Sequence, residues 1–195
     1  MIGGDGNMER DGATLAPVIE TARLRLRIHV AGDHAARCAI TADPETMRFI
    51  SGQPQSAEEN WLRILRYVGH WRLFGYGVFA VEETATGRLA GEAGLMHFGR
   101  DLGGDFDPAP EAAWIMAAWA AGQGYASEAI TAAIAWHEGK VGNARQVCII
   151  APDNHPSLRV AAKHGFRPYR ETLYHGKPVI VHERVQPLPF HAEPR

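Results

Sequence analysis

Residues 111–129 read Glu111-Ala-Ala-Trp-Ile-Met-Ala-Ala-Trp-Ala-Ala-Gly122-Gln-Gly124-Tyr-Ala-Ser-Glu-Ala129: a bulky apolar segment, then two glycines, then mostly small residues. The bulky segment favours a β-strand, and the small residues favour a helix. The glycines between them let the backbone turn so that its N–H groups converge at the N-terminus of the helix, where an anion is stabilised. This stretch therefore predicts a strand, a glycine loop and a helix that together could hold a pyrophosphate.

The glycine loop by itself is compatible with several kinds of protein. One alternative is a plain turn before an ordinary helix. A Walker loop is excluded because no Gly-Lys-Ser/Thr follows Gly124. A nucleotide-binding Rossmann domain is disfavoured because Ser127 occupies the third glycine position of GxGxxG, and because the loop lies past the middle of the chain.

A second polar stretch spans residues 151–166. It follows an apolar strand predicted over residues 146–151 and leads into a helix predicted over residues 156–164, which Gly165 ends. Asn154 supplies an amide beyond the strand, and Ser157 supplies a hydroxyl in the first helical turn. Each could be an ordinary turn or cap residue. If the two strands are neighbours, both residues lie beside the glycine loop.

Hydrophobic spacing indicates the remaining elements. Leucine and isoleucine alternate with arginine and predict one half-buried strand over residues 19–30. A capping box from Ser56 to Glu59 opens a long helix that ends near Gly75. The predicted order is strand, two helices, three strands, helix, strand, helix, two strands, which is an α/β or α+β layer fold.

Four stretches in this order resemble one known family: residues 20–27 (ETARLRLR), 87–95 (GRLAGEAGL), 111–129, and 154–166 (NHPSLRVAAKHGF). They resemble the GNAT superfamily of acyl-CoA-dependent N-acetyltransferases. They are most similar to the branch of ribosomal-protein N-terminal acetyltransferases (RimJ/RimL-like). The resemblance implies a mixed, mostly antiparallel central sheet of about seven strands, with helices on both faces and a splay between strands 4 and 5.

The resemblance also implies a cofactor, acetyl-CoA, which leaves as CoA. Its pantetheine would lie between the splayed strands against backbone groups, and the amides of the glycine loop would hold its pyrophosphate. The residues expected at the cofactor are Ile115, Met116, Ala117, Gly122, Gln123, Gly124, Tyr125, Ala126, Ser127, Asn154 and Ser157. The chain departs from the family pattern at Trp119, where the family has Gln or Arg.

Acetyl transfer to an amine needs a neutral amine, a proton acceptor and help for the departing thiolate. By the same resemblance, Ser157 occupies the position of the acid, and it would also hold the sulfur by hydrogen bonding. Glu111, at the start of the fourth strand and facing the acceptor, and Glu171, on the sixth strand, are the candidate bases. Further candidates are His97, His155 and His175. No group of side chains shows metal-ligand spacing, so we expect no metal.

We therefore expect an enzyme that transfers an acetyl group to a primary amine, on a protein N-terminus or a small molecule, by direct attack in a ternary complex. The alternative is a non-catalytic acyl-CoA-binding module, which would not need a hydroxyl near the sulfur. A loop with Asp101, Asp105 and Asp107 precedes the fourth strand. It is either a solvated loop or one that attracts a cationic amine.

Composition narrows the partners. Lys and Arg total 20 and Asp and Glu total 22 among 195 residues. This balance argues against a nucleic-acid partner, because proteins that bind nucleic acids usually carry an excess of positive charge. The longest apolar run, residues 112–121, is too short to cross a bilayer, which takes about 20 residues. Two cysteines, Cys38 and Cys148, fit reduced thiols in a cytoplasmic protein. We expect one acetyltransferase domain over residues 16–186, between a flexible leader (1–15) and a tail (187–195), in a monomer or homodimer.

Overall fold

A computed structural model describes residues 17–142 and 145–185 of the chain. Its strands are β1 (Val18–Glu20), β2 (Leu24–Arg27), β3 (Val78–Glu83), β4 (Leu89–Met96), β5 (Glu111–Met116), β6 (Gln146–Ile150), β7 (Arg167–Tyr174) and β8 (Lys177–Arg184). Its helices are α1 (His34–Thr41), α2 (Pro44–Met47), α3 (Ala57–Phe74), α4 (Tyr125–Val141) and α5 (His155–Lys163), with short 3-10 helices η1 (Ala31–Asp33) and η2 (Ala118–Ala120). The expected leader and tail lie outside the described residues.

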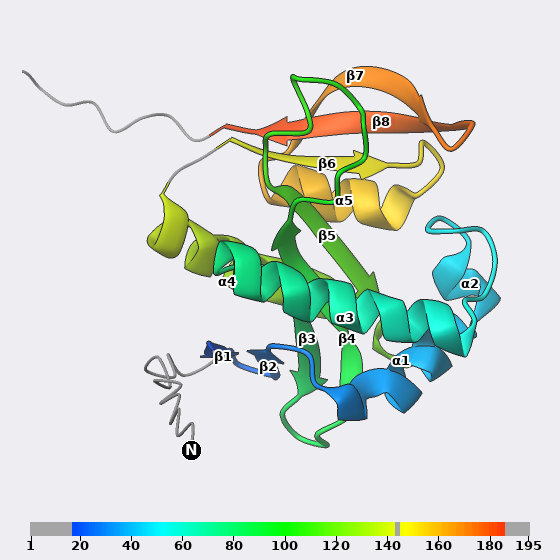
Figure 1. Cartoon of the computed structure of the whole chain (residues 1–195), viewed down its shortest axis with the longest axis vertical. Coiled ribbons are helices and arrows are strands. Elements are labelled where there is room, and N and C mark those ends of the chain that lie inside the picture. Colours follow the sequence, from blue (N-terminus) through cyan, green and yellow to red (C-terminus); the bar gives the residue numbers. More distant parts are fainter. Residues whose placement is uncertain (1–16, 143–144, 186–195) are drawn as a thin grey trace, which may run out of the picture.

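All of the described strands join one sheet in the order β1-β2-β3-β4-β5-β6-β8-β7. Every neighbouring pair is antiparallel except β5 and β6, which are parallel. The last three strands in this order lie together at one end of the molecule, across the direction of β3 and β4 (Figure 1). The expected mixed, mostly antiparallel sheet is confirmed.

In the described residues the sheet has eight strands, one more than the seven that the predicted order contains. The single strand expected over residues 19–30 is a hairpin in which Ile19 pairs with Leu26. Thr21 closes its turn: the hydroxyl donates to Leu24 O (3.0 Å) and accepts from Leu24 N (2.9 Å). The turn holds no Gly or Pro, so the alternation of apolar and charged residues runs through it and hides it.

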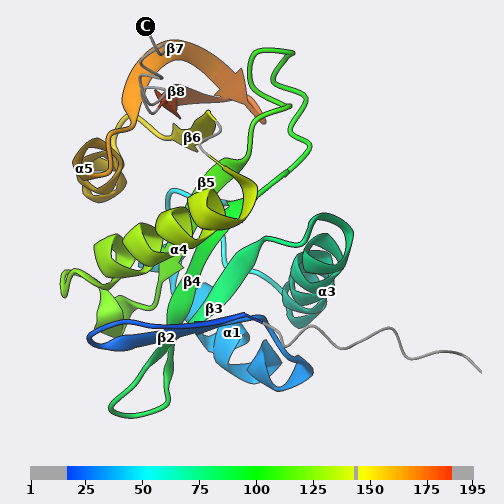
Figure 2. The ribbon, with the colours of Figure 1, turned by 90° about the vertical axis from the view of Figure 1, so that its left-hand side faces the viewer.

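Helices cover both faces of the sheet, as expected: α4 and α5 lie on one side, and α1 and α3 on the other (Figure 2). On the first side, Ala93 of β4 shares the main apolar core with Ala129 of α4. On the second side, Val78 of β3 packs with Tyr67 of α3. Because successive strand residues point to opposite faces, both faces can be apolar in the central strands.

The long helix begins and ends where its sequence signals stand. Ser56 and Glu59 form the capping box: Glu59 N donates to Ser56 Oγ (3.2 Å), and Ser56 N donates to the Glu59 carboxylate (2.7 Å). Gly75 ends the helix with a φ of 73°, in the left-handed region that favours glycine. The helix is thereby set in register against the sheet.

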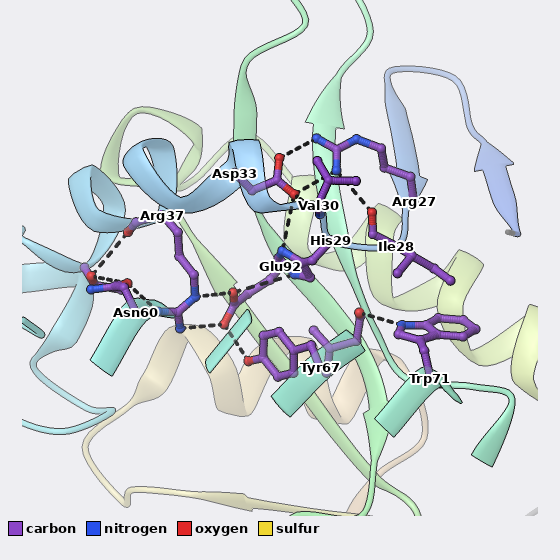
Figure 3. A network of polar contacts seen from close by, with 12 residues as sticks. Arg27, Ile28, His29, Val30, Asp33, Arg37, Asn60, Tyr67, Trp71 and Glu92 are labelled. Atoms are coloured by element: carbon purple, nitrogen blue, oxygen red, sulfur yellow. Dashed lines mark hydrogen bonds and ion pairs between the residues drawn. The ribbon is translucent and has the colours of Figure 1, made fainter. Parts of the chain in front are cut away.

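A network of buried charges ties α1 and α3 to the sheet (Figure 3). Arg37 of α1 is only 2% exposed and donates to both oxygens of Glu92 on β4, at 3.0 and 3.3 Å. Tyr67 donates to the same carboxylate (2.7 Å), and Arg37 also donates to Asn60 Oδ1. Burial alone would raise the pKa of Glu92, but the Arg37 guanidinium and its other partners hold that pKa below its usual value. The carboxylate therefore stays charged inside the fold.

Arg37→Ala should remove about 3–5 kcal/mol from the free energy of unfolding, because it leaves the Glu92 carboxylate buried without its cation. Urea unfolding followed by circular dichroism measures this. Arg48→Ala is the control, since the exposed Arg48 contacts Glu45 at 3.9 Å and the neighbouring Phe49 ring at 5.0 Å, and it should change stability by less than about 0.5 kcal/mol. Equal, small losses in the two variants would contradict the anchoring role of the network.

Candidate active site

The strands β5 and β6 are joined at one point only. Glu111 pairs with Val147, whose N–H donates to Pro110 O (3.0 Å). Between residues 112 and 116 of β5 no further bridge to β6 occurs in the described chain, while the other edge of β5 stays paired with β4 as far as Met116. The expected splay is thus confirmed, and it leaves one edge of β5 with open backbone groups.

Ile115 and Met116, which the sequence analysis predicted to pair with a pantetheine, lie on this open stretch. Ala117 lies just past the strand, and its N–H already donates to Ala90 O (2.8 Å). Gly91 of β4 makes the close packing beneath them possible. A Cβ atom at that position would stand 2.1 Å from Ile115 O and 2.9 Å from the Met116 Cα. Only glycine fits there without moving β5.

The glycine loop has the geometry of an anion site. Gly122 and Gly124 adopt φ values of 75° and 81°, in the left-handed region that favours glycine. The first bond of α4 runs from Glu128 N to Gly124 O (3.0 Å). Among the described residues, no N–H from Gly122 to Ser127 donates to another protein group. These free amides at the positive end of a helix fit a pyrophosphate.

Side chains in the loop support it rather than face a ligand. The Tyr125 hydroxyl donates to Glu83 of β3 (2.6 Å) and Tyr125 is buried. The Gln123 side-chain amide donates to Trp119 O (2.7 Å). The Arg88 guanidinium covers the Trp119 ring at 4.2 Å. At the position where the family has Gln or Arg, this chain therefore contributes a carbonyl and a packed ring.

Arg23 clamps the loop, a role that the sequence analysis missed. Its guanidinium donates to Gln123 O (2.9 Å) and to the Glu128 carboxylate (2.8 Å), and Thr21 donates to the same carboxylate (2.6 Å). Alternation assigned Arg23 only to the polar face of a strand. The one available signal was its place in the 20–27 stretch that resembles the family.

Ser157 stands across the splay from β5. Asn154 caps α5, since its Oδ1 accepts from Ser157 N (3.2 Å). The Trp114 indole N–H donates to Ser157 Oγ (3.3 Å), which links β5 to α5 over the opening between the strands. Trp114 was also missed, because in the sequence it reads only as a bulky strand residue. The structure thus places the Ser157 hydroxyl at the Trp114 side chain of β5.

Glu111 lies at the apex of the splay and is 3% exposed. Both of its oxygens accept from Arg100, each at 2.6 Å. Burial raises the pKa of the Glu111 carboxyl, and Arg100 acts in the opposite direction. Each oxygen keeps a second lone pair, but a carboxylate that is nearly buried and bonded by a guanidinium on both oxygens is poorly accessible to an amine.

Glu171, the other candidate base, lies away from this apex. It is exposed on β7 and pairs with Ile180 of β8, which in turn pairs with Ile150 of β6. Glu171 therefore lies two strands from β6, on the sheet face opposite to that of Val147 and Glu111. The structure does not bring the two candidate carboxylates together.

The acidic loop before β5 is held by its own acids. Asp107 accepts from Gly103 N (2.8 Å), and Asp105 accepts from the Tyr169 hydroxyl (3.3 Å) and from Arg170 (3.4 Å). Asp107 thus closes the loop on itself, and Asp105 fixes it against β7. Within residues 17–142 and 145–185, no cluster of His, Cys, Asp or Glu could hold a metal ion, and no helix is long and apolar enough to span a membrane.

Comparison with known proteins indicates the same class of protein as the fold and the glycine loop do. The sequence pattern of one protein family, the acetyltransferase (GNAT) domain, matches residues 23–167. A structure from Bordetella pertussis, assigned to the GnaT family of acetyltransferases, has a TM-score of 0.79 and 31% identity, and covers 87% of this chain and 99% of its own. The chain therefore belongs to the GNAT acetyltransferase family, a family of N-acetyltransferases that use acetyl-CoA.

Two further relatives lie at lower identity. The Bacillus subtilis (strain 168) protein YkkB is 25% identical over 169 residues, which is 84% of this chain and 93% of that protein. RimL, the ribosomal L7/L12 α-N-protein acetyltransferase, has a TM-score of 0.69 at 15% identity and covers 90% of this chain and 98% of its own. It is also known in complex with coenzyme A. At that identity the likeness to RimL shows the fold alone.

Arg23→Ala should weaken the binding of acetyl-CoA about tenfold, because the charge-assisted hydrogen bonds that hold the glycine loop are lost. Isothermal titration measures the dissociation constant. Arg25→Ala, two residues further on in β2, is the matched control, since among the described residues its guanidinium contacts only the exposed Glu20 at 3.3 Å, and its dissociation constant should stay within about twofold. The same affinity in the Arg23 and Arg25 variants would contradict the clamp.

Proposed function

We propose that this chain transfers an acetyl group from acetyl-CoA to the α-amine of an amino acid or peptide, by direct attack in a ternary complex. The observation that carries the proposal is the run of free N–H groups from Gly122 to Ser127, beside the open edge of β5. RimL, which shares the fold, is described as an α-N-protein acetyltransferase, and this agrees with an α-amine acceptor.

Each part of the opening has a separate task. Acetyl-CoA supplies the acetyl group activated as a thioester. The loop amides bind its pyrophosphate, and backbone groups of Ile115 and Met116 pair with its pantetheine. An N–H of β5 on the open edge faces the thioester oxygen and stabilises the negative charge that develops there. In the overall reaction the C–S bond breaks, a C–N bond forms, and the amine loses a proton.

Ser157 acts on the sulfur. Because the Trp114 N–H already donates to Ser157 Oγ, the hydroxyl proton remains free to point toward the departing thiolate. A hydroxyl is a weak acid, so holding the sulfur contributes at least as much as protonating it. Trp114 is a positioning residue in this scheme. Asn154, whose oxygen caps α5, fixes the helical turn that carries the hydroxyl.

The choice of an α-amine follows from proton transfer. At pH 7.5 about a quarter of α-amines are neutral, whereas only about 0.1% of lysine side chains are, from their ordinary pKa values. Both oxygens of Glu111 are engaged by Arg100, and Glu171 lies two strands from β6. We propose that water takes the proton and that Glu111 holds Arg100 in place. An acceptor with a low pKa suits such a site.

The alternative is a module of the same fold that binds acyl-CoA without catalysis. Binding needs the loop and the open strand edge, but it does not need a hydroxyl held at the sulfur. The hydrogen bond from Trp114 to Ser157 across the splay therefore favours the enzyme.

Thiol release tests the function directly. At pH 7.5, acetyl-CoA should be consumed with a peptide whose α-amine is free and whose lysines are absent. A matched peptide with a blocked α-amine and one lysine should react at least about 50-fold more slowly, because its amine is almost fully protonated. Isothermal titration first shows that acetyl-CoA binds. Binding without thiol release from any amine would support the non-catalytic module instead.

Ser157→Ala should lower kcat at least about tenfold while the dissociation constant of acetyl-CoA changes less than about twofold. Trp114→Phe keeps the ring volume near that of Trp and removes the N–H, so it should lower kcat several-fold through Ser157. The double variant should be no worse than Ser157→Ala alone, since the two residues act as one unit. Additive losses would show that Trp114 acts independently of the hydroxyl.

A further inference from the structure

Three guanidinium groups gather at the end of β5 where Glu111 lies. Arg100 contacts Glu111 and lies 4.6 Å from the Phe98 ring and 4.8 Å from the Tyr174 ring. Arg66 of α3 lies 5.4 Å from the same Phe98 ring and donates to Phe98 O. Arg63, one turn earlier on α3, is the third; it lies 5.9 Å from the ring of Tyr67, which packs with Met96 opposite Glu111. Like charge from Arg63 and Arg100, after burial, lowers the pKa of Arg66, which places the three within electrostatic reach.

The positive charge of this group exceeds its negative charge. The carboxylates that act on it are Glu111, which Arg100 engages on both oxygens, and Asp107, which lies near Glu111 and accepts from Gly103 N. In the described part of the chain, neither Arg63 nor Arg66 has a carboxylate within 4.0 Å. One net positive charge remains. Arg66 is exposed, so a ligand can reach it.

The group lies on the side from which an acceptor has to approach. The free amides of the glycine loop belong to α4, on one face of the sheet (Figure 2). Glu111 points to the other face, because it stands opposite Met96, whose side chain packs with Tyr67 of α3. A cofactor bound from the α4 side presents its thioester through the splay toward the α3 side. The guanidinium groups therefore face the space in front of the reacting carbon.

We infer that Arg66, supported by Arg63 and Arg100, binds a carboxylate of the acceptor. The substrate class is an α-amine with a carboxylate close by: the α-carboxylate of a free amino acid, or an acidic residue that follows the N-terminus of a peptide. A guanidinium offers the paired donors that a carboxylate takes, and the Phe98 ring and carbonyl hold Arg66 ready. The inference rests on the proposed function and differs from the alternative in which the acidic loop attracts a cationic amine.

Matched acceptors test this inference. The pairs are Ala-Asp-Ala-amide with Ala-Asn-Ala-amide, which tests an acidic second residue, and alanine with alaninamide, which tests the α-carboxylate. In at least one pair, the member with the carboxylate should have a kcat/KM about tenfold higher or more. The difference should shrink as salt rises, since it is electrostatic. The pair that shows it identifies the source of the carboxylate.

Arg66→Gln should raise KM for the preferred acceptor about tenfold and leave its uncharged partner unchanged. Arg72→Gln is the control: Arg72 is an exposed arginine of the same helix and makes no contact with Phe98, Arg100 or Glu111 among the described residues. It should leave both members of the pair unchanged. Titration of the preferred acceptor into the complex with CoA measures acceptor affinity without turnover. Arg66→Gln should lower this affinity by the same factor, about tenfold.

The outcomes separate the two proposals. Thiol release from all four acceptors at equal kcat/KM would overturn the carboxylate site and leave the acetyltransferase intact. An equal rise of KM in the Arg66 and Arg72 variants would show that only the overall positive charge of the helix matters. That result would also overturn the carboxylate site. No thiol release from any acceptor, with acetyl-CoA bound, would overturn the proposed function and the inference together.

Discussion

The single parallel bridge between Glu111 and Val147 is the constraint on which the rest of the site depends. Strands that paired along their whole length would satisfy each other and leave no backbone group for a ligand. Here the pair separates after one residue, and a buried ion pair between Glu111 and Arg100 stands at the point of separation. A charge buried at that point needs its partner, so the apex is fixed while the strands beyond it diverge. A cofactor can then be held by backbone groups that a closed sheet would use up.

The polar groups that could meet a ligand differ between the two faces of the sheet: they are backbone N–H groups on one face and charged side chains on the other. On the α4 face, free N–H groups of the loop lie at a helix terminus, and side chains of the loop serve as supports, as Tyr125 and Gln123 do. On the α3 face, charges come from side chains: Arg37 and Glu92 neutralise each other beneath the helices, whereas Arg66 has no carboxylate partner among the described residues. Neutralised buried charge supports the fold, and unneutralised accessible charge is available for a substrate.

Local sequence signals predicted the elements whose ends are marked by capping residues or glycines. The Ser56 and Glu59 capping box, the glycines of the loop and Asn154 at the start of α5 act over a few residues, so their meaning survives any fold around them. The β1–β2 hairpin was missed because its turn is closed by the Thr21 hydroxyl and contains no Gly or Pro, the residues that usually indicate a turn in a sequence. Arg23 and Trp114 were missed for a different reason. Their partners, Gln123 and Ser157, lie far along the chain, and no local pattern encodes a contact at such a separation.

The sequence by itself determined the strand, glycine loop and helix, the hydroxyl at Ser157, and through them the family, because these depend on backbone conformation and short-range spacing. Only the tertiary structure decided what the charged side chains do. In the sequence Glu111 cannot be told from any other carboxylate, whereas the structure shows that it is buried and accepts from Arg100 on both oxygens. In the sequence Arg66 reads as a solvated helix charge, whereas the structure places it at the Phe98 ring that Arg100 also contacts. A charged group's role is set by its partners and its access to water, and both are decided by parts of the chain far from it.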